Sequence, residues 1–254
     1  RFNAALNRAG IDVRQGSLFE PVGGQEFDLI TSNPPFVITP QSVREQVSLE
    51  YRDGMMRRDS LIPLILEQGL THLAPGGTLQ MLANWEVGEG PWETRPESWV
   101  RAAARRVVDE GKGVRAWIVQ RDLVDVRTYA GWWMRDAHGE GMDAQAWNAE
   151  LREWLTDFAA AGTRQVGLGS INVTLTESPG VVVVSEFLQD GPAPDGQAVQ
   201  VALGNLELPA GWEECAFQRG ADVREVRYYK PGEPDPEIIM LTQGRAGGRE
   251  RQAS

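Results

Sequence analysis

The chain has 254 residues, of which 41% are hydrophobic and 24% charged, as in ordinary globular proteins. Its net charge of −11 argues against a protein that coats nucleic acid nonspecifically, and no apolar stretch reaches the roughly 20 residues of a membrane span. One cysteine and two histidines exclude an internal disulfide and a metal site made of these residues. We therefore expect a cytoplasmic protein with no membrane partner and no metal.

Helix and strand patterns alternate up to about residue 125. Short apolar runs predict strands at 11–13 and 27–31. Apolar residues then recur at helical spacing, from a cap at Asp59 or Ser60 to the break at Pro75. The elements expected after this helix are a strand at 78–83, a helix at 99–110 and a strand at 114–119. The alternation predicts an α/β fold with a mostly parallel sheet.

The pattern changes after Asp122. Residues 143–161 predict a long amphipathic helix whose aromatic stripe we interpret as core. Strands dominate the rest of the chain, and they are expected at 166–176, 181–188, 198–201 and 225–229. Residues 244–254 are polar and rich in arginine, so we expect a flexible tail.

The segment Asn33-Pro34-Pro35-Phe36 follows directly on the strand predicted at 27–31. With 15 prolines in the chain, about one Pro-Pro pair is expected by chance, but Asn before it and an aromatic residue after it lower the expectation to roughly 0.002. The carboxyl end of a strand is also where α/β sheets bind ligands. The motif is therefore predicted to be a functional site and not only a turn.

The residue types of this motif suit the methylation of a planar amine. The nitrogen lone pair of an amide or aryl amine is delocalised, so two acceptors aimed at its N–H bonds are needed to turn the lone pair toward a methyl donor. The Asn33 side-chain carbonyl supplies one acceptor and the Pro34 backbone carbonyl, held rigid by two prolines, supplies the other. Phe36 offers a flat face on which a base or an amide can stack. Positioning then carries the catalysis, and no strong general base is required.

These residues resemble the class I methyltransferases with an Asn-Pro-Pro-aromatic motif, which include release-factor glutamine methyltransferases, ribosomal RNA guanine methyltransferases and adenine-modifying DNA methylases. The likeness extends upstream, because Gly16-Ser17-Leu18-Phe19 stands where the glutamine methyltransferases carry Gly-Asp-Trp/Leu-Phe, at the same interval from the motif. The resemblance implies S-adenosyl-L-methionine as cofactor, with Ser17 and Leu18 beside its adenine and Asn33 near its methyl group. Ser17 replaces the Asp of the family, so the hydrogen bond that this Asp makes with the adenine amine is not expected in the same form.

The resemblance also implies a helix at residues 2–7 and a Rossmann-like sheet with an antiparallel last strand, for which residues 167–176 are the candidate. The glycine-rich cofactor loop and the ribose-binding acid of the family are absent from the chain. We therefore expect residues 1–190 to be a catalytic domain that lacks its first strands and this loop. Residues 191–243 are expected to form a β-rich extension.

Further candidates for the substrate pocket end other predicted strands or lie in the loop after the motif. Asn84 and Trp85 end the strand at 78–83, and Arg121 ends the strand at 114–119. Arg52 belongs to the loop between the motif and the next helix, where lids form in such enzymes. For Asn84, Trp85 and Arg121 the plain alternative is a packed or polar strand end. Trp132-Trp133 is either a stacking platform for bases or, as we expect, part of the core.

Together these observations predict an S-adenosylmethionine-dependent N-methyltransferase that acts on a protein glutamine or on the exocyclic amine of a base. The acidic composition favours protein or RNA over duplex DNA as the partner. The alternative is a non-catalytic, methyltransferase-like interaction module that has lost cofactor binding, and the missing glycine-rich loop is its main support.

Overall fold

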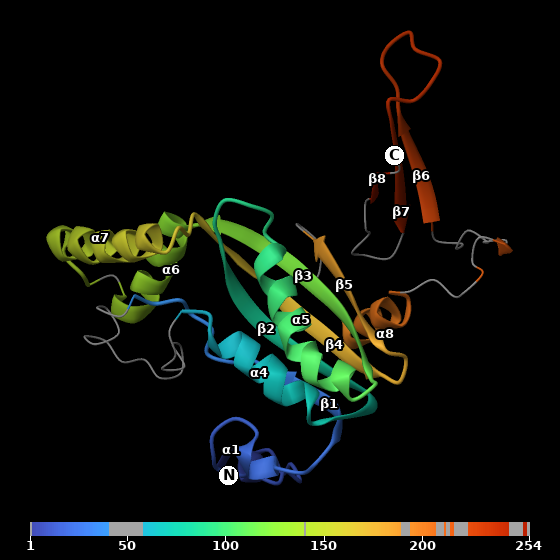
Figure 1. The fold of residues 1–254 in the computed structure, drawn as a ribbon. Coiled ribbons are helices and arrows are strands. Elements are labelled where there is room, and N and C mark those ends of the chain that lie inside the picture. Colours follow the sequence, from blue (N-terminus) through green and yellow to red (C-terminus); the bar gives the residue numbers. More distant parts are fainter. Residues whose placement is uncertain are drawn as a thin grey trace.

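The computed structural model describes residues 2–40, 58–139, 141–188, 194–206, 211, 214–215, 223–243 and 251–252. Its main feature is a five-stranded sheet with the strand order β1-β2-β4-β3-β5 (Figure 1). The strands of this sheet are β1 (Phe27–Ser32), β2 (Leu73–Val87), β3 (Gly113–Asp125), β4 (Gln165–Thr176) and β5 (Gly180–Phe187).

Four of these five strands run in the same direction. β1 is parallel to β2 and β3 is parallel to β5, whereas β4 is antiparallel to both of its neighbours, β2 and β3. The sheet is therefore of the predicted Rossmann-like, mainly parallel type. β4 is antiparallel as predicted, but contrary to the prediction it is not the last strand of the sheet. β5 follows β4 in the chain and extends the sheet beyond β3.

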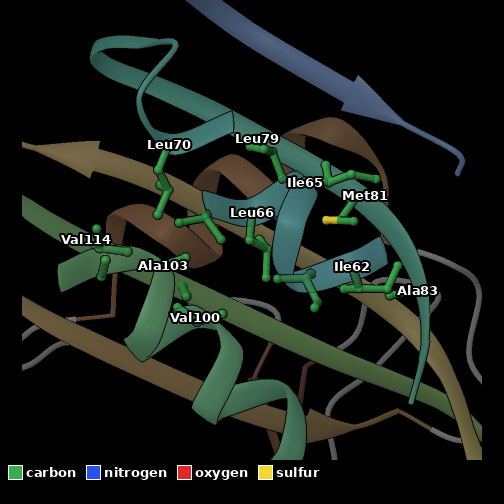
Figure 2. Packing of buried hydrophobic residues seen from close by; sticks show 14 of the residues in the cluster. Ile62, Ile65, Leu66, Leu70, Leu79, Met81, Ala83, Val100, Ala103 and Val114 are labelled. Atoms are coloured by element: carbon green, nitrogen blue, oxygen red, sulfur yellow. The ribbon is translucent and has the colours of Figure 1, made fainter. Parts of the chain in front are cut away.

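One face of the sheet is covered by α4 (Leu61–Leu70) and α5 (Thr94–Asp109). Figure 2 shows side chains of α4 packed against Leu79, Met81 and Ala83 of β2, with α5 and Val114 of β3 beside them. The apolar residues of α4 recur three or four positions apart, so one face of the helix is apolar and is buried here. The predicted helix is confirmed, but it ends at Leu70 and not at Pro75, because β2 begins at Leu73. Its predicted cap is not confirmed, because Ser60 makes no side-chain capping bond and Asp59 binds Arg95 instead.

The other face of the sheet is partly covered by α8 (Gly196–Gly204), where a strand was predicted at 198–201. Successive residues of a strand point to opposite faces, so Trp117 and Val119 of β3 lie on the face away from α5. The buried α8 residues Val199, Ala202 and Leu203 pack against these two side chains. Their spacing of three and one is helical, and the Asp195 side chain accepts a bond from Ala198 N at 2.8 Å, so the predicted strand was wrong.

Two helices, α6 (Val126–His138) and α7 (Ala144–Ala160), lie between β3 and β4 in the chain and beyond one end of the sheet (Figure 1). The predicted aromatic stripe of α7 is confirmed as core, since Leu151, Trp154 and Phe158 pack with Tyr129 of α6. The same cluster contains Val37 and Ile38, which directly follow the Asn-Pro-Pro-Phe motif. α6 itself was not predicted. The helix pair thus packs against the segment that leaves the motif.

The amino-terminal region differs in part from its prediction. A helix is present as α1 (Phe2–Leu6), and η1 (Glu20–Val22) is a short 3-10 helix. Residues 11–13 form no strand, and the Ile11 and Val13 side chains are exposed. Among the described strands β1 pairs only with β2, so residues 11–13 have no strand beside them to supply hydrogen bonds.

A second, three-stranded sheet is formed by β6 (Val223–Tyr228), β7 (Ile238–Gln243) and β8 (Arg251–Gln252). Of the predicted strands beyond residue 190, only the one at 225–229 corresponds to a strand of this sheet. Apart from Arg251–Gln252, the predicted flexible tail lies outside the described residues, and the predicted domain boundaries stay predictions. None of the described helices combines the length and the apolar character needed to cross a bilayer.

The beginning of α6 is held by a side-chain cap that gives a pH-dependent prediction. Asp125 accepts bonds from Arg127 N and Thr128 N, both at 3.0 Å, and from the Thr128 hydroxyl at 2.6 Å. The Thr128 hydroxyl and backbone bonds lower the pKa of Asp125 below its ordinary value. Because the folded-state pKa is the lower one, the stabilisation is complete above the unfolded-state pKa and is lost as the pH falls through the folded-state pKa.

We expect Asp125→Ala to lower the free energy of unfolding by about 1 kcal/mol at pH 7, as for other helix caps. The difference from the wild type should shrink as the pH falls below about 4. Urea unfolding of the wild type and of Asp125→Ala at several pH values measures this difference in the free energy of unfolding. Asp125→Asn keeps an acceptor but cannot titrate, so its stability relative to Asp125→Ala should not change with pH. A pH-independent deficit in Asp125→Ala would contradict the assignment.

Candidate functional site

A cavity of about 510 Å³ lies beside the end of β1 and the middle of β2 and β4. Its lining includes Gln80 and Asn84 of β2 and Ser170 and Asn172 of β4. Ser170 and Asn172 pair in register with Val119 and Trp117, which face α8, and Val199 of α8 closes part of the cavity. The cavity therefore lies on the face of the sheet away from α4 and α5, and its volume is typical of a small-molecule site.

The Asn-Pro-Pro-Phe motif stands at the carboxyl end of β1, as predicted. Asn33 and Phe36 line the cavity, whereas Pro34 and Pro35 are not among its lining residues. The Asn33 side chain is exposed and makes no hydrogen bond with any described residue, and Pro34 is buried. Phe36 is half-buried and packs against the core under α4. The motif thus presents a free amide and the side of an aromatic ring to the cavity.

Asn84 and Trp85 are neighbours in β2, but only Asn84 reaches the cavity. The Trp85 ring is fully buried on the opposite face, where it stacks on Trp92 with ring centroids 5.8 Å apart. Its indole N–H donates to Gln120 Oε1 at 3.1 Å. The suggestion that both residues line the pocket is thus corrected for Trp85, because consecutive residues of a strand point to opposite faces.

Arg121 lines the cavity at a break in the pairing of β3 with β4. Gln120 pairs with Gly169 and Asp122 pairs with Leu168, so Arg121 is the extra residue of a β-bulge. Bulges re-aim side chains beside functional sites, and this one brings Arg121 to the same cavity as Asn33. Among the described lining residues Arg121 is the only charged one, and no carboxylate is present. The predicted Arg52 lies outside the described residues.

Ser17 and Leu18, the predicted adenine contacts, are exposed and do not belong to the cavity lining. The next residue, Phe19, stacks on His72 with centroids 4.9 Å apart, and His72 directly precedes β2. Phe19 therefore lies near the amino ends of β1 and β2. Asn33 follows the carboxyl end of β1, six residues or roughly 20 Å further along the sheet. The described residues do not bring Ser17 and Leu18 together with Asn33, and their role stays a prediction.

A contact that sequence reasoning missed joins the motif segment to Asn84. Tyr129 of α6 is fully buried, and its hydroxyl accepts hydrogen bonds from Ile38 N and from Asn84 Nδ2, both at 3.0 Å. The sequence carried one signal for the helix that positions this residue. Asp125 followed by Thr128 and an apolar stretch is typical of a helix start, although it gives no indication of the tyrosine's partners.

An ion-pair network connects the end of β2 with α4, α5 and α7. Glu86 binds Arg58 and accepts a hydrogen bond from Thr163 Oγ1 at 2.9 Å. Arg58 also binds Asp157, and Arg95 binds Asp59 at 2.6 and 2.7 Å. Burial disfavours the charge of Arg58, but its bonds to Glu86 and Asp157 outweigh this and raise its pKa. The network thus gives Arg58 and Asp59, which lie just before α4, partners of opposite charge.

Comparison with known proteins finds no matching family model. The chain is similar to the release factor glutamine methyltransferase of Geobacter sulfurreducens, with 38% identity over 98 residues, which cover 36% of this chain. The matched part spans 33% of the length of that relative.

Two solved structures are also similar. A candidate sarcosine dimethylglycine methyltransferase from Galdieria sulphuraria matches with 14% identity and a TM-score of 0.32, covering 72% of this chain and 64% of that one. The phosphoethanolamine N-methyltransferase 2 of Haemonchus contortus, in complex with S-adenosyl-L-methionine, matches with 10% identity and a TM-score of 0.21, covering 61% and 34%. These scores are too low to bear on the activity of the chain.

Proposed function

We propose that the protein is an S-adenosylmethionine-dependent N-methyltransferase that transfers a methyl group to an uncharged planar amine. The observation that carries the proposal is the place of Asn33-Pro34-Pro35-Phe36 at the carboxyl end of β1, with Asn33 and Phe36 on one cavity. The likeness to a release factor glutamine methyltransferase supports the same reaction class.

The chemistry of the cavity favours a neutral acceptor. Its described lining contains the amide side chains Asn33, Gln80, Asn84 and Asn172 and no carboxylate. A protonated amine moved from water into such a site would lose hydration without gaining an opposite charge from the described lining. An amide or an exocyclic base amine carries no charge and finds carbonyl acceptors for its N–H groups.

Each residue of the motif has a proposed role in the reaction. The Asn33 Oδ1 atom and the Pro34 carbonyl accept the two N–H bonds of the amine, which turns its lone pair out of conjugation. Phe36 supports the plane of the amide or base. When bound, S-adenosylmethionine supplies an electrophilic methyl group. Transfer of this methyl group to the nitrogen would release S-adenosylhomocysteine, and the extra proton on the nitrogen would pass to water.

The cavity residues fit the amine and the methyl end of the cofactor better than they fit its adenosine. Asn33 and Phe36 are in place, but Ser17 and Leu18 lie away from the cavity among the described residues. We keep Ser17 and Leu18 as the proposed adenine contacts, which requires that they approach the carboxyl ends of the strands in the cofactor-bound protein. A protein glutamine is the first acceptor to test, given the relative's name, and RNA is the second.

The test uses protein expressed from the complete gene and S-adenosylmethionine carrying a labelled methyl group. Acceptors are a release factor, a single-stranded RNA, a duplex DNA and a lysine-rich peptide as the cationic control. We expect label on the glutamine amide or on a base amine and none on the peptide. Label on lysine would overturn the proposed acceptor class. An absence of both transfer and cofactor binding by calorimetry would favour the non-catalytic interaction module.

A further inference from the structure

Tyr129 connects two parts of the proposed site that are far apart in the chain. Its hydroxyl accepts one hydrogen bond from the backbone of Ile38, two residues after Phe36, and one from the side chain of Asn84 at the cavity. Both donors lie 3.0 Å from the hydroxyl oxygen, and the tyrosine is fully buried in the cluster of α6 and α7. The position of α6 therefore determines how the motif segment and Asn84 are placed relative to each other.

The bond to Tyr129 also determines which atom of Asn84 is left for a ligand. Asn84 is buried, with 1% of its surface exposed, and it lines the cavity. Its Nδ2 atom donates to Tyr129, whereas its Oδ1 atom accepts no bond from the residues that the structure describes. The N–H of an amine in the cavity would supply this carbonyl with a donor.

We propose that Tyr129 is a positioning residue that keeps the Asn84 carbonyl directed into the cavity, where it shares with Asn33 the N–H bond that Asn33 accepts and so helps to select an amine with two N–H bonds. This inference rests on the proposed methyl transfer and adds a role for the α6 helix to it. Without the hydroxyl, the Asn84 amide can rotate and present its N–H group, which repels an N–H donor.

Tyr129→Phe tests the inference, because it keeps the ring in the cluster and removes only the hydroxyl. We expect kcat to fall about 10-fold, since small misplacements at a reacting centre are costly, while the Kd for S-adenosylmethionine stays unchanged. Asn84→Ala should cause a similar fall. The double variant should lose less than the product of the two single losses, because both single variants remove the same hydrogen bond between Tyr129 and Asn84. Unchanged turnover in Tyr129→Phe, or additive losses in the double variant, would overturn the inference.

Trp154→Phe is the matched control for general loosening of the cluster. Trp154 belongs to the same cluster as Tyr129, and its indole N–H donates to Glu150 at 3.3 Å. The variant removes this hydrogen bond but leaves the bond between Tyr129 and Asn84 in place. We expect it to lower the melting temperature without lowering kcat. Equal losses of kcat in Trp154→Phe and Tyr129→Phe would mean that Tyr129 acts only through stability.

A second readout keeps this inference separate from the proposed function. The side-chain NH2 resonances of Asn84 can be identified by their absence in Asn84→Ala, and their exchange with solvent can be followed without any substrate. We expect slow exchange in the wild type and much faster exchange in Tyr129→Phe. Equal exchange in both would contradict the positioning role. A wild type without methyl transfer, but with this exchange difference, would instead refute the proposed function alone.

Discussion

Replacing Asn33 by alanine is expected to slow methyl transfer by roughly 100-fold or more. The variant removes one of the two acceptors that orient the amine, and a carbonyl placed in advance is worth more in the transition state than in the ground state. The side chain is exposed and has no partner among the described residues, so its loss should leave stability nearly unchanged. Single-turnover rates with the natural acceptor, together with calorimetric cofactor titration, separate the two effects. Cofactor affinity should fall much less than the rate.

Gln80→Ala is the matched control for this experiment. Gln80 is also an amide side chain that lines the cavity, but it belongs to the middle of β2 and not to a strand end. Its removal should change the rate far less than the loss of Asn33. A wild-type rate in Asn33→Ala, or an equal loss in both variants, would sink the assignment of Asn33 as the amine acceptor.

Replacing Glu86 by glutamine is expected to lower the free energy of unfolding by about 3 kcal/mol. Glu86 is 7% exposed and is the carboxylate that Arg58, Arg95 and Thr163 share. Glutamine keeps the shape and one acceptor oxygen but removes the charge of Glu86, so the partly buried Arg58 is left with Asp157 as its only carboxylate partner among the described residues. Arg58 and Arg95 both keep some contact with water. We therefore expect a loss of unfolding free energy at the lower end of the range that is typical of broken buried ion pairs. Urea unfolding at pH 7 measures the change.

Glu89→Gln serves as the comparison for Glu86. Glu89 pairs with Arg164, but the two side chains are 78% and 66% exposed, so the variant should lose less than about 1 kcal/mol. Raising the salt concentration should weaken the small Glu89 contribution more than that of Glu86, because exposed pairs are screened first. Similar losses in both variants would show that the Glu86 network adds little to stability.

Local patterns were sufficient to predict the elements that surround the motif. The alternating or continuous apolar residues of β1, β4 and β5, and the helical spacing in α4, α5 and α7, are properties of short stretches, and all six elements were found. The motif itself could be placed at a strand end because Pro34 and Pro35 cannot continue a parallel ladder. Asn84 and Arg121, which were expected to end their strands, line the cavity together with Asn33, although β2 continues to Val87 and β3 to Asp125 and β4 separates these two strands.

Tertiary contacts determine the features that local patterns did not predict, namely α8, the position of Arg121 and the contacts of Tyr129. Residues 196–204 contain a Val-Gln-Val-Ala pattern that suits a strand or a helix, and the apolar surface of Trp117 and Val119 together with the Asp195 cap selects α8. Arg121 reaches the cavity through a bulge that depends on the register with β4. Tyr129 binds partners 45 and 91 positions away in the chain. A sequence pattern reports on neighbours within a few residues, whereas a hydrogen bond across such distances exists only once separate elements have packed together.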